Sequence, residues 1–107
     1  MIIAEGTIDF ENKIKRLSND LSSGGHEAEV TFQMILEMSG LNDARVDYLL
    51  AIAYLNGYGT EQNCAKSAHY YRKAISEGSK ASYMELFDTL WRINTPESLK
   101  EMVDLAL

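Results

Sequence analysis

Apolar residues recur along this chain at intervals of three and four, the spacing that places them on one face of an α-helix. Phe10, Ile14, Leu17 and Leu21 form the first such stripe. No segment alternates apolar and polar residues as a half-buried strand would. The pattern therefore predicts an all-α chain with short helices over residues 9–21, 26–38, 44–56, 64–77, 80–92 and 96–107.

Residues that start or end helices flank these segments. Glycine tolerates the left-handed backbone that closes a helix, and it follows four of the predicted ends, as Gly24, Gly40, Gly57 and Gly78. Short polar side chains accept hydrogen bonds from the free amides of a first turn. We therefore expect Asn42 or Asp43 to cap the third helix, Asn63 the fourth and Thr95 the sixth, where Pro96 takes the first helical position.

Six short helices joined by short turns form three antiparallel pairs. Gly40 and Gly78 each follow the second helix of a pair, and the difference between 78 and 40 gives a period of 38 residues. A single pair of this size cannot bury its apolar face, so the pairs must stack on one another. On the last helix, we expect an apolar face formed by Leu99, Met102, Val103 and Leu107.

The stretch from residue 44 to residue 78 carries a run of motifs in register. The matching residues are Leu50-Ala51-Ile52-Ala53-Tyr54, Gly57-Tyr58-Gly59-Thr60, Asn63, Lys66-Ser67, Tyr70-Tyr71-Arg72-Lys73-Ala74 and Glu77-Gly78. Together they resemble the Sel1-like repeat, a relative of the tetratricopeptide repeat. The family usually has Asp where this chain has Asn63, and the segments on either side match the pattern poorly.

The resemblance implies a short right-handed solenoid of three helix pairs. Residues 1–107 then form one domain, with a cap pair at 1–40, the central repeat at 41–78 and a second cap pair at 79–107. The family's small residues let helix backbones approach closely, and its tyrosines fill the space between helices. The resemblance also implies adaptor or scaffold work, in which the first helix of each pair lines a concave binding side.

Composition restricts the possible partners. The 16 acidic and 10 basic residues give a net charge of -6, which disfavours nucleic acids and anionic membranes. The single cysteine cannot form an internal disulfide, which favours a reducing cytoplasm. No apolar run has the length of a membrane span, and the first residues lack the basic and apolar regions of a signal peptide. A basic protein is the partner that this charge favours.

No catalytic or metal-binding motif is present. His26 is followed four residues later by Val30, so a His-Glu-x-x-His zinc motif fails. His69 lies five residues after Cys64, so the two side chains do not face one another on a helix. We therefore expect no enzyme activity, no metal and no cofactor, and we interpret Cys64 as a partly buried packing residue.

Candidate binding residues lie on the predicted third and fifth helices. Tyr83, Phe87 and Trp91 form a stripe that is either core under the last helix or an exposed strip of the kind found at interface hot spots. Asp88 flanks the stripe. The candidate partner-binding set is Arg45, Asp47, Tyr48, Ile52, Tyr83, Asp88, Trp91 and Arg92.

Charge is unevenly distributed along the chain. Residues 1–60 hold nine acids and four bases, a net of -5, whereas the remainder holds seven acids and six bases, a net of -1. An acidic half could cover the cationic groove of a nuclease. We therefore expect a monomeric, non-catalytic binding protein, in the first instance a bacterial immunity protein that neutralises a basic toxin. The alternative is a signalling or envelope-assembly adaptor.

Overall fold

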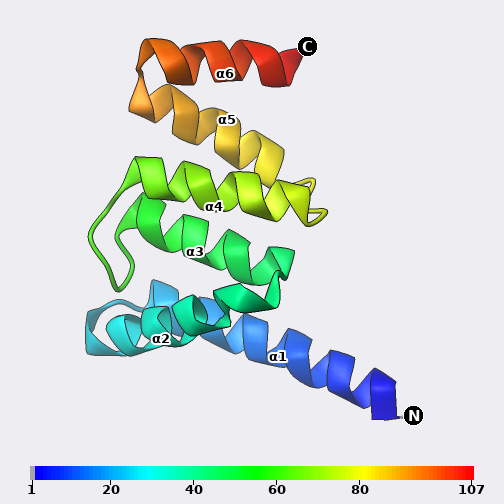
Figure 1. Ribbon diagram of the computed structural model, residues 1–107. Coiled ribbons are helices and arrows are strands. Elements are labelled where there is room, and N and C mark those ends of the chain that lie inside the picture. Colours follow the sequence, from blue (N-terminus) through cyan, green and yellow to red (C-terminus); the bar gives the residue numbers. More distant parts are fainter. Residues whose placement is uncertain (1) are drawn as a thin grey trace.

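The computed structural model describes the backbone of residues 2–107 and the side chains of residues 10–107, and this part of the chain is all-α. Six α-helices and one 3₁₀ turn, η1, follow one another in the described part (Figure 1). Their bounds are α1 Ile2–Ser22, α2 Gly25–Met38, η1 Ser39–Leu41, α3 Ala44–Asn56, α4 Cys64–Ser76, α5 Ser82–Ile93 and α6 Pro96–Ala106.

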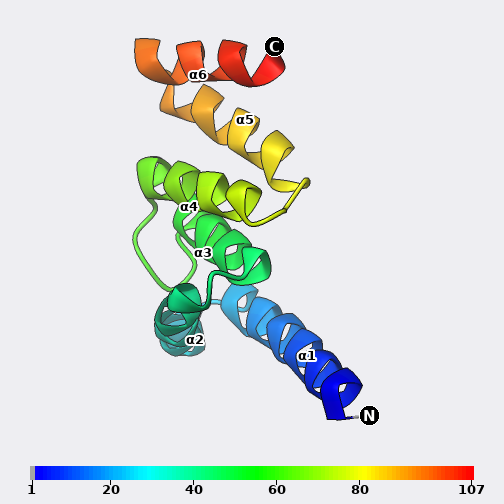
Figure 2. The same ribbon diagram turned by 45° about the vertical axis from the view of Figure 1, so that its right-hand side comes forward.

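Successive helices run in alternating directions and are arranged one after another along the molecule (Figure 1). Turning the molecule by 45° keeps this order, with α1 and α2 at one end and α6 at the other (Figure 2). The extents are 48 × 34 × 19 Å and the radius of gyration is 14.6 Å, above the roughly 13 Å of a rounder domain of this length. The elongated shape leaves much of each helix at the surface.

Helices α3, α4 and α6 begin at predicted capping residues. The predicted third helix, 44–56, is confirmed, and Asp43 caps it by accepting a 2.9 Å hydrogen bond from the amide of Arg45. Asn42 instead adopts a left-handed backbone with φ of 55°. The predicted start of the first helix at Asp9 is wrong, because α1 begins at Ile2; of residues 2–8 only Gly6 opposes a helix, by about 1 kcal/mol.

The cap of α6 agrees with the prediction. Thr95 accepts a 3.1 Å hydrogen bond from the amide of Ser98, as an N-cap should. The hydroxyl of Ser98 in turn accepts a 2.9 Å bond from the amide of Thr95 and so completes a capping box. Ser98 therefore adds a second capping bond to the one that Thr95 makes.

Two apolar clusters make up the core. One joins α1, α2 and α3 around Leu21, Ile35 and Leu50, and the other joins α3, α4 and α5 around Tyr71 and Leu86. The small residues predicted to allow close helix approach are fully buried, which confirms their packing role: Ala51, Ala53, Ala68 and Ala74.

Tyrosine rings fill the spaces between the helices, as predicted. The ring of Tyr54 meets Phe32 of α2 edge-on at 5.3 Å and stacks on Tyr70 of α4 at 5.7 Å. One ring on α3 therefore links three helices. Within residues 2–107, none of the helices is both long and apolar enough to traverse a bilayer.

Candidate protein-binding surfaces

The outer side of α5 presents large apolar side chains to solvent. Tyr83, Met84, Phe87 and Trp91, here named the aromatic strip, are 48%, 81%, 40% and 64% exposed. The opposite side of the same helix carries Leu86 and Leu90, which are buried against the core. Of the two interpretations that the sequence left open, core or exposed strip, the structure selects the exposed strip.

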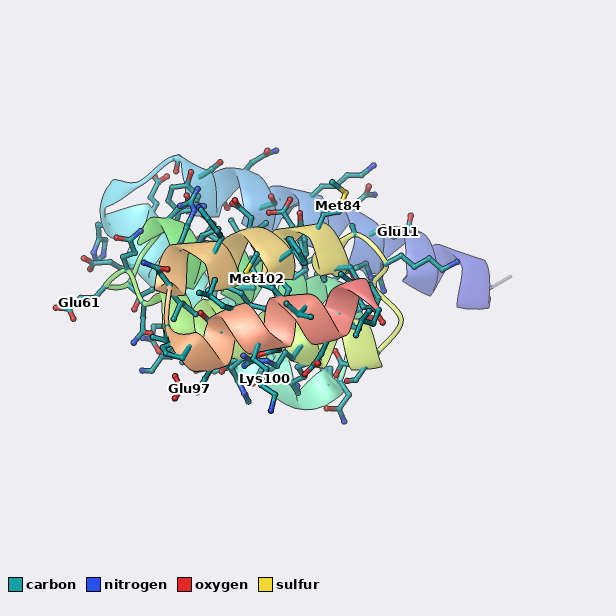
Figure 3. All side chains as sticks on the ribbon, turned by 90° about the horizontal axis from the view of Figure 1, so that it is seen from above. Glu11, Glu61, Met84, Glu97, Lys100 and Met102 are labelled. Carbon is teal, nitrogen blue, oxygen red and sulfur yellow. The ribbon has the colours of Figure 1, made fainter. Side chains whose placement is uncertain are left out.

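The apolar surface continues onto α6. A crevice of about 250 Å³ lies between the start of α5 and the end of α6, lined by Tyr83, Met84, Phe87, Leu105 and Ala106. Seen from above, Met102 lies between the two helices (Figure 3). Trp91 of the aromatic strip is not among the residues that line the crevice. The aromatic strip therefore borders the crevice and also reaches beyond it.

The residues of the predicted apolar face of the last helix do not all pack inward. Met102 packs against the core, but Leu99, Val103 and Leu107 are exposed. The inner side of α6 is formed by Ser98, Met102 and Leu105, so the apolar residues of this helix occupy two sides rather than one. Leu99 and Val103 add exposed apolar surface to α6.

Charged residues flank the aromatic strip. The Nε of Arg92 lies 3.4 Å from Oδ2 of Asp88, one helical turn away, and both side chains are at least half exposed. An exposed pair of this kind contributes little to stability. Of the predicted partner-binding residues, Tyr83, Asp88, Trp91 and Arg92 thus share one accessible surface on α5, with the two charges directed at each other.

A second surface is a groove of about 720 Å³ on the other part of the molecule. Its walls come from α1, the first half of α3 and the turn between α4 and α5. Two of the predicted residues, Arg45 and Tyr48, line it. The full lining is Ile14, Lys15, Ser18, Asn19, Ala44, Arg45, Tyr48, Leu49, Gly78, Ser79 and Ala81.

Arg45 is held in place within this groove. Its guanidinium donates two hydrogen bonds to Asp43, of 3.0 and 2.9 Å, and lies 4.6 Å from the ring centre of Phe10. Glu11 of α1 is 4.0 Å away. The hydrogen bond to Arg45 holds the pKa of the Asp43 carboxyl below its usual value. Arg45 therefore links α1 to α3. Because its guanidinium is already paired with Asp43, it is less available to bind a ligand.

Tyr48 and Ile52 are half-buried and pack against the second core cluster. The Tyr48 ring meets Tyr71 edge-on at 5.9 Å. Burial, with a smaller contribution from Glu85, raises the pKa of the Tyr48 hydroxyl. Only part of the Tyr48 and Ile52 side chains is therefore accessible to a partner.

The prediction that Asp47 belongs to an exposed binding surface is wrong. Its side chain is 0% exposed and both of its carboxylate oxygens lie 3.2 Å from Nζ of Lys73 on α4. Asp47 lies between Val46 and Tyr48 on the side of α3 that packs against α4, so it faces the interior. This residue has a structural role in the folded protein.

The acidic half does not form one continuous surface in the described part. Glu27, Glu29 and Glu37 are exposed on α2, whereas Asp43 is paired with Arg45. The side chains of Glu5 and Asp9 lie outside the residues whose side chains are described. Acidic charge is thus spread along the first helices.

The sequence identified the aromatic residues of the strip as candidate binding residues. It did not identify Met84, Leu99 and Val103 as exposed apolar surface. Met84 is the most exposed residue of the strip, and its position next to Tyr83 is the signal that could have revealed it. Leu99 and Val103 had the spacing of a buried stripe. Periodicity alone cannot distinguish an apolar face that contacts a neighbour from one that contacts solvent.

The residues with potential chemistry lie apart. His69 is exposed and meets the ring of Tyr70 edge-on at 5.1 Å, and Cys64 is half-buried at the start of α4. Among side chains 10–107, no three His, Cys, Asp or Glu residues converge on a point where a metal could bind.

Comparison with models of protein families, with curated proteins and with solved structures found no match to this chain. The similarity to Sel1-like repeats accordingly rests on the residue pattern between 44 and 78.

Proposed function

We propose that this protein is a non-catalytic protein-binding module and that the aromatic strip of α5, with the adjoining side of α6, is its principal binding surface. The carrying observation is the exposure of Tyr83, Met84, Phe87 and Trp91 on one side of one helix. An aromatic side chain has roughly 150–250 Å² of surface. Three rings exposed by about half offer roughly 300 Å², the size of the largest apolar patch on a typical monomer, which is often functional.

The chemistry of the strip fits a binding role. Tyrosine and tryptophan are enriched among the residues that dominate interface energetics, because they bury a large area at a small cost in side-chain entropy. Asp88 and Arg92 beside them can exchange their mutual pairing for contacts with a partner. The crevice between α5 and α6 gives a protruding partner side chain a place to insert.

The narrower proposal is that the partner is a basic toxin, possessing for example a nuclease groove, and that this protein is the immunity protein that neutralises it in a bacterial cytoplasm. The net charge of -6 on 107 residues supports this proposal. An acidic protein associates faster with a basic one, and the acceleration weakens as salt is added. On this proposal the strip supplies affinity and the acidic residues of α2 supply electrostatic steering.

The groove lined by α1 and α3 favours a second candidate function, an adaptor that joins two proteins. It lies on helices that do not contribute to the aromatic strip. Two separate surfaces would let one chain hold two partners at once. A signalling or envelope-assembly adaptor uses surfaces in this way.

We further propose that the three helix pairs form a short Sel1-like solenoid within one domain, 1–107. The alternating helix directions and the packing of each helix on the next support this proposal (Figures 1 and 2). The residues that match the family between 44 and 78 belong to α3, α4 and the loop between them.

Site-specific crosslinking tests the principal surface. A photo-reactive phenylalanine analogue is placed at Trp91, or as a matched control at the exposed Glu61 of the α3–α4 loop, and irradiated in cells of the source organism. The proposal expects one stoichiometric protein adduct from position 91 and none from position 61. Trp91→Ala should then weaken binding of the purified partner at least tenfold, because central aromatic contacts contribute about 2 kcal/mol or more. Equal affinity of the wild type and Trp91→Ala would overturn the proposal.

Properties of the captured partner separate the two candidate functions. A basic protein that loses a nuclease or other toxic activity in a 1:1 complex would support the immunity proposal. A second protein that binds simultaneously, and that is released by Lys15→Glu but not by Trp91→Ala, would support the adaptor. A single partner without toxic activity would contradict the immunity proposal.

A further inference from the structure

A buried charge cluster joins α3, the end of α4 and η1. The Nζ atom of Lys73 lies 3.2 Å from both oxygens of Asp47 and 3.7 Å from Oε2 of Glu77. It also donates a 3.0 Å hydrogen bond to the backbone carbonyl of Ser39. One ammonium therefore serves two carboxyl groups that lie 30 residues apart in the sequence, at 47 and 77.

The charges in this cluster do not balance if both carboxyl groups are ionised. The Asp47 side chain is 0% exposed, Glu77 is 12% exposed and Lys73 is 30% exposed. The Oε1 atom of Glu77 is buried, and no described atom forms a hydrogen bond with it. Burying an ionised carboxylate with one oxygen unsatisfied is costly, whereas one proton on the pair leaves one negative and one positive charge.

We propose that Asp47, Lys73 and Glu77 form a pH-responsive clasp, which is closed while Glu77 carries a proton and loosens when Glu77 ionises. The proposal does not rest on the aromatic strip, because it concerns the joint between α3 and α4.

Several features indicate that Glu77, rather than Asp47, holds the proton. Asp47 receives close contacts from Lys73 on both oxygens, whereas Glu77 receives one contact at 3.7 Å. Glu77 also follows the last residue of α4, where the helix dipole disfavours negative charge. The neighbouring Asp47 carboxylate, followed by burial, raises the pKa of the Glu77 carboxyl to about 7, against the opposing effect of Lys73.

The groups that face Glu77 come from each packed element. α3 contributes the Asp47 carboxylate, and α4 contributes the Lys73 ammonium. The Tyr70 hydroxyl of α4 responds to both Asp47 and Lys73, so it too lies within the field of the cluster. The 3₁₀ turn η1 contributes the uncharged backbone carbonyl of Ser39.

The clasp adjoins two of the segments that line the groove. Asp47 precedes the lining residues Tyr48 and Leu49 of α3, and Glu77 precedes Gly78 and Ser79 of the α4–α5 turn. The cluster thus ties together two of the walls that define the groove. Loosening it above neutral pH would let these walls move relative to each other.

The direction of the Glu77 pKa shift determines how the stability of the protein changes with pH. An acid whose pKa rises from 4.5 unfolded to about 7 folded binds more protons in the folded state. Its stabilising effect is complete below about pH 4.5 and is lost as the pH rises through 7. Between pH 5.5 and 8.5 the unfolding equilibrium constant should therefore increase on the order of 30-fold.

Urea unfolding followed by circular dichroism tests the clasp. The wild type and Glu77→Gln are compared at pH 5.5 and 8.5, with Glu97→Gln on the exposed surface of α6 as the control. The neutral amide mimics protonated Glu77, so Glu77→Gln should lose most of the pH dependence whereas Glu97→Gln should retain it. The same pH profile in the wild type and Glu77→Gln would overturn the proposal.

A direct titration decides the question even if Glu77→Gln fails to fold. The carboxyl ¹³C resonance of Glu77 in the wild-type protein should titrate near pH 7. Amide hydrogens of residues 39–41 and 77–79 should exchange faster at pH 8.5 than at pH 5.5 after correction for the intrinsic rate. Titration of Glu77 near 4.5, or exchange that is unchanged across this range, would contradict the clasp.

Discussion

Gly59 of the α3–α4 loop lies directly against the backbone of Ala28 on α2. A Cβ atom added at residue 59 would overlap the carbonyl oxygen of Ala28, and it would lie 2.7 Å from the carbonyl carbon and 2.9 Å from Cβ of Phe32. The backbone of Gly59 also has a φ of 71°, which favours glycine. This contact joins the loop of the central helix pair to the pair before it.

We predict that Gly59→Ala destabilises the protein by about 3 kcal/mol or more. A left-handed backbone costs an alanine about 1 kcal/mol, and the overlap with α2 adds a cost comparable to overpacking a core. The free energy of unfolding in urea measures the change. Gly25→Ala is the matched control, because Gly25 has a φ of 70° with no atom within 4 Å of the added Cβ. Equal losses for the two variants would show that the contact with Ala28 is unimportant.

Much of the fold could be predicted because local signals determine it. Apolar periodicity, glycines and capping side chains located six helices, and the bounds 44–56 agree with α3. The role of Gly59 was predicted only in part: the sequence indicated a turn, whereas the approach to Ala28 depends on how two helix pairs stack. Contacts between residues distant in the sequence leave no periodic signal.

Prediction of the candidate site was limited in the same way, because contacts between distant residues decide which side chains are exposed. Tyr83 and Trp91 were identified by their spacing, and their exposure follows from the orientation of α5. Asp47 was assigned to a binding surface, whereas a charged residue of this kind is fully buried only when it is paired. Its partner, Lys73, lies 26 residues later on a different helix, so the pairing becomes apparent only in three dimensions.

Two neighbouring basic residues of α4 should differ in their effect on stability. Lys73→Met leaves the buried Asp47 without its counterion and should cost about 3 kcal/mol. Arg72→Met removes two hydrogen bonds of 2.6 Å to Glu101 of α6, but that pair is partly exposed and should cost at most about 1 kcal/mol. Thermal and urea unfolding of both variants check this order. The reverse order would mean that α6 depends on Arg72 more than α3 depends on Lys73.

The N-cap residue of α4, Asn63, differs from the Asp that is usual in Sel1-like repeats, and the effect of this difference can be tested. Oδ1 of Asn63 accepts a 3.0 Å hydrogen bond from the amide of Lys66, so Asn63→Ala should destabilise the protein by about 1 kcal/mol. Asn63→Asp restores the residue usual in Sel1-like repeats, keeps the acceptor and places negative charge at a helix N-terminus. It should therefore be neutral or stabilising by up to about 1 kcal/mol. Destabilisation by Asn63→Asp as large as by Asn63→Ala would show that another property of Asn63 matters.

Trp91 is the single tryptophan of the chain, so its fluorescence reports directly on the aromatic strip. Because the side chain is 64% exposed, emission should lie at the long wavelengths of a hydrated indole and be quenched efficiently by iodide. Trp91→Ala should change the free energy of unfolding by no more than about 0.5 kcal/mol, as is usual at exposed positions. Binding of a partner at the strip should shift the emission to shorter wavelengths and protect it from iodide.

Measurements over a range of protein concentrations distinguish self-association of this chain from binding of a different protein. If the emission of the isolated protein shifts to shorter wavelengths as its concentration rises, and sedimentation shows a matching increase in mass, the strip is occupied by self-association. If both remain constant, the strip stays open in the isolated protein and a different protein must cover it. Protected, short-wavelength emission at every concentration without any increase in mass would contradict the exposed strip itself, since the indole would then be buried within a single chain.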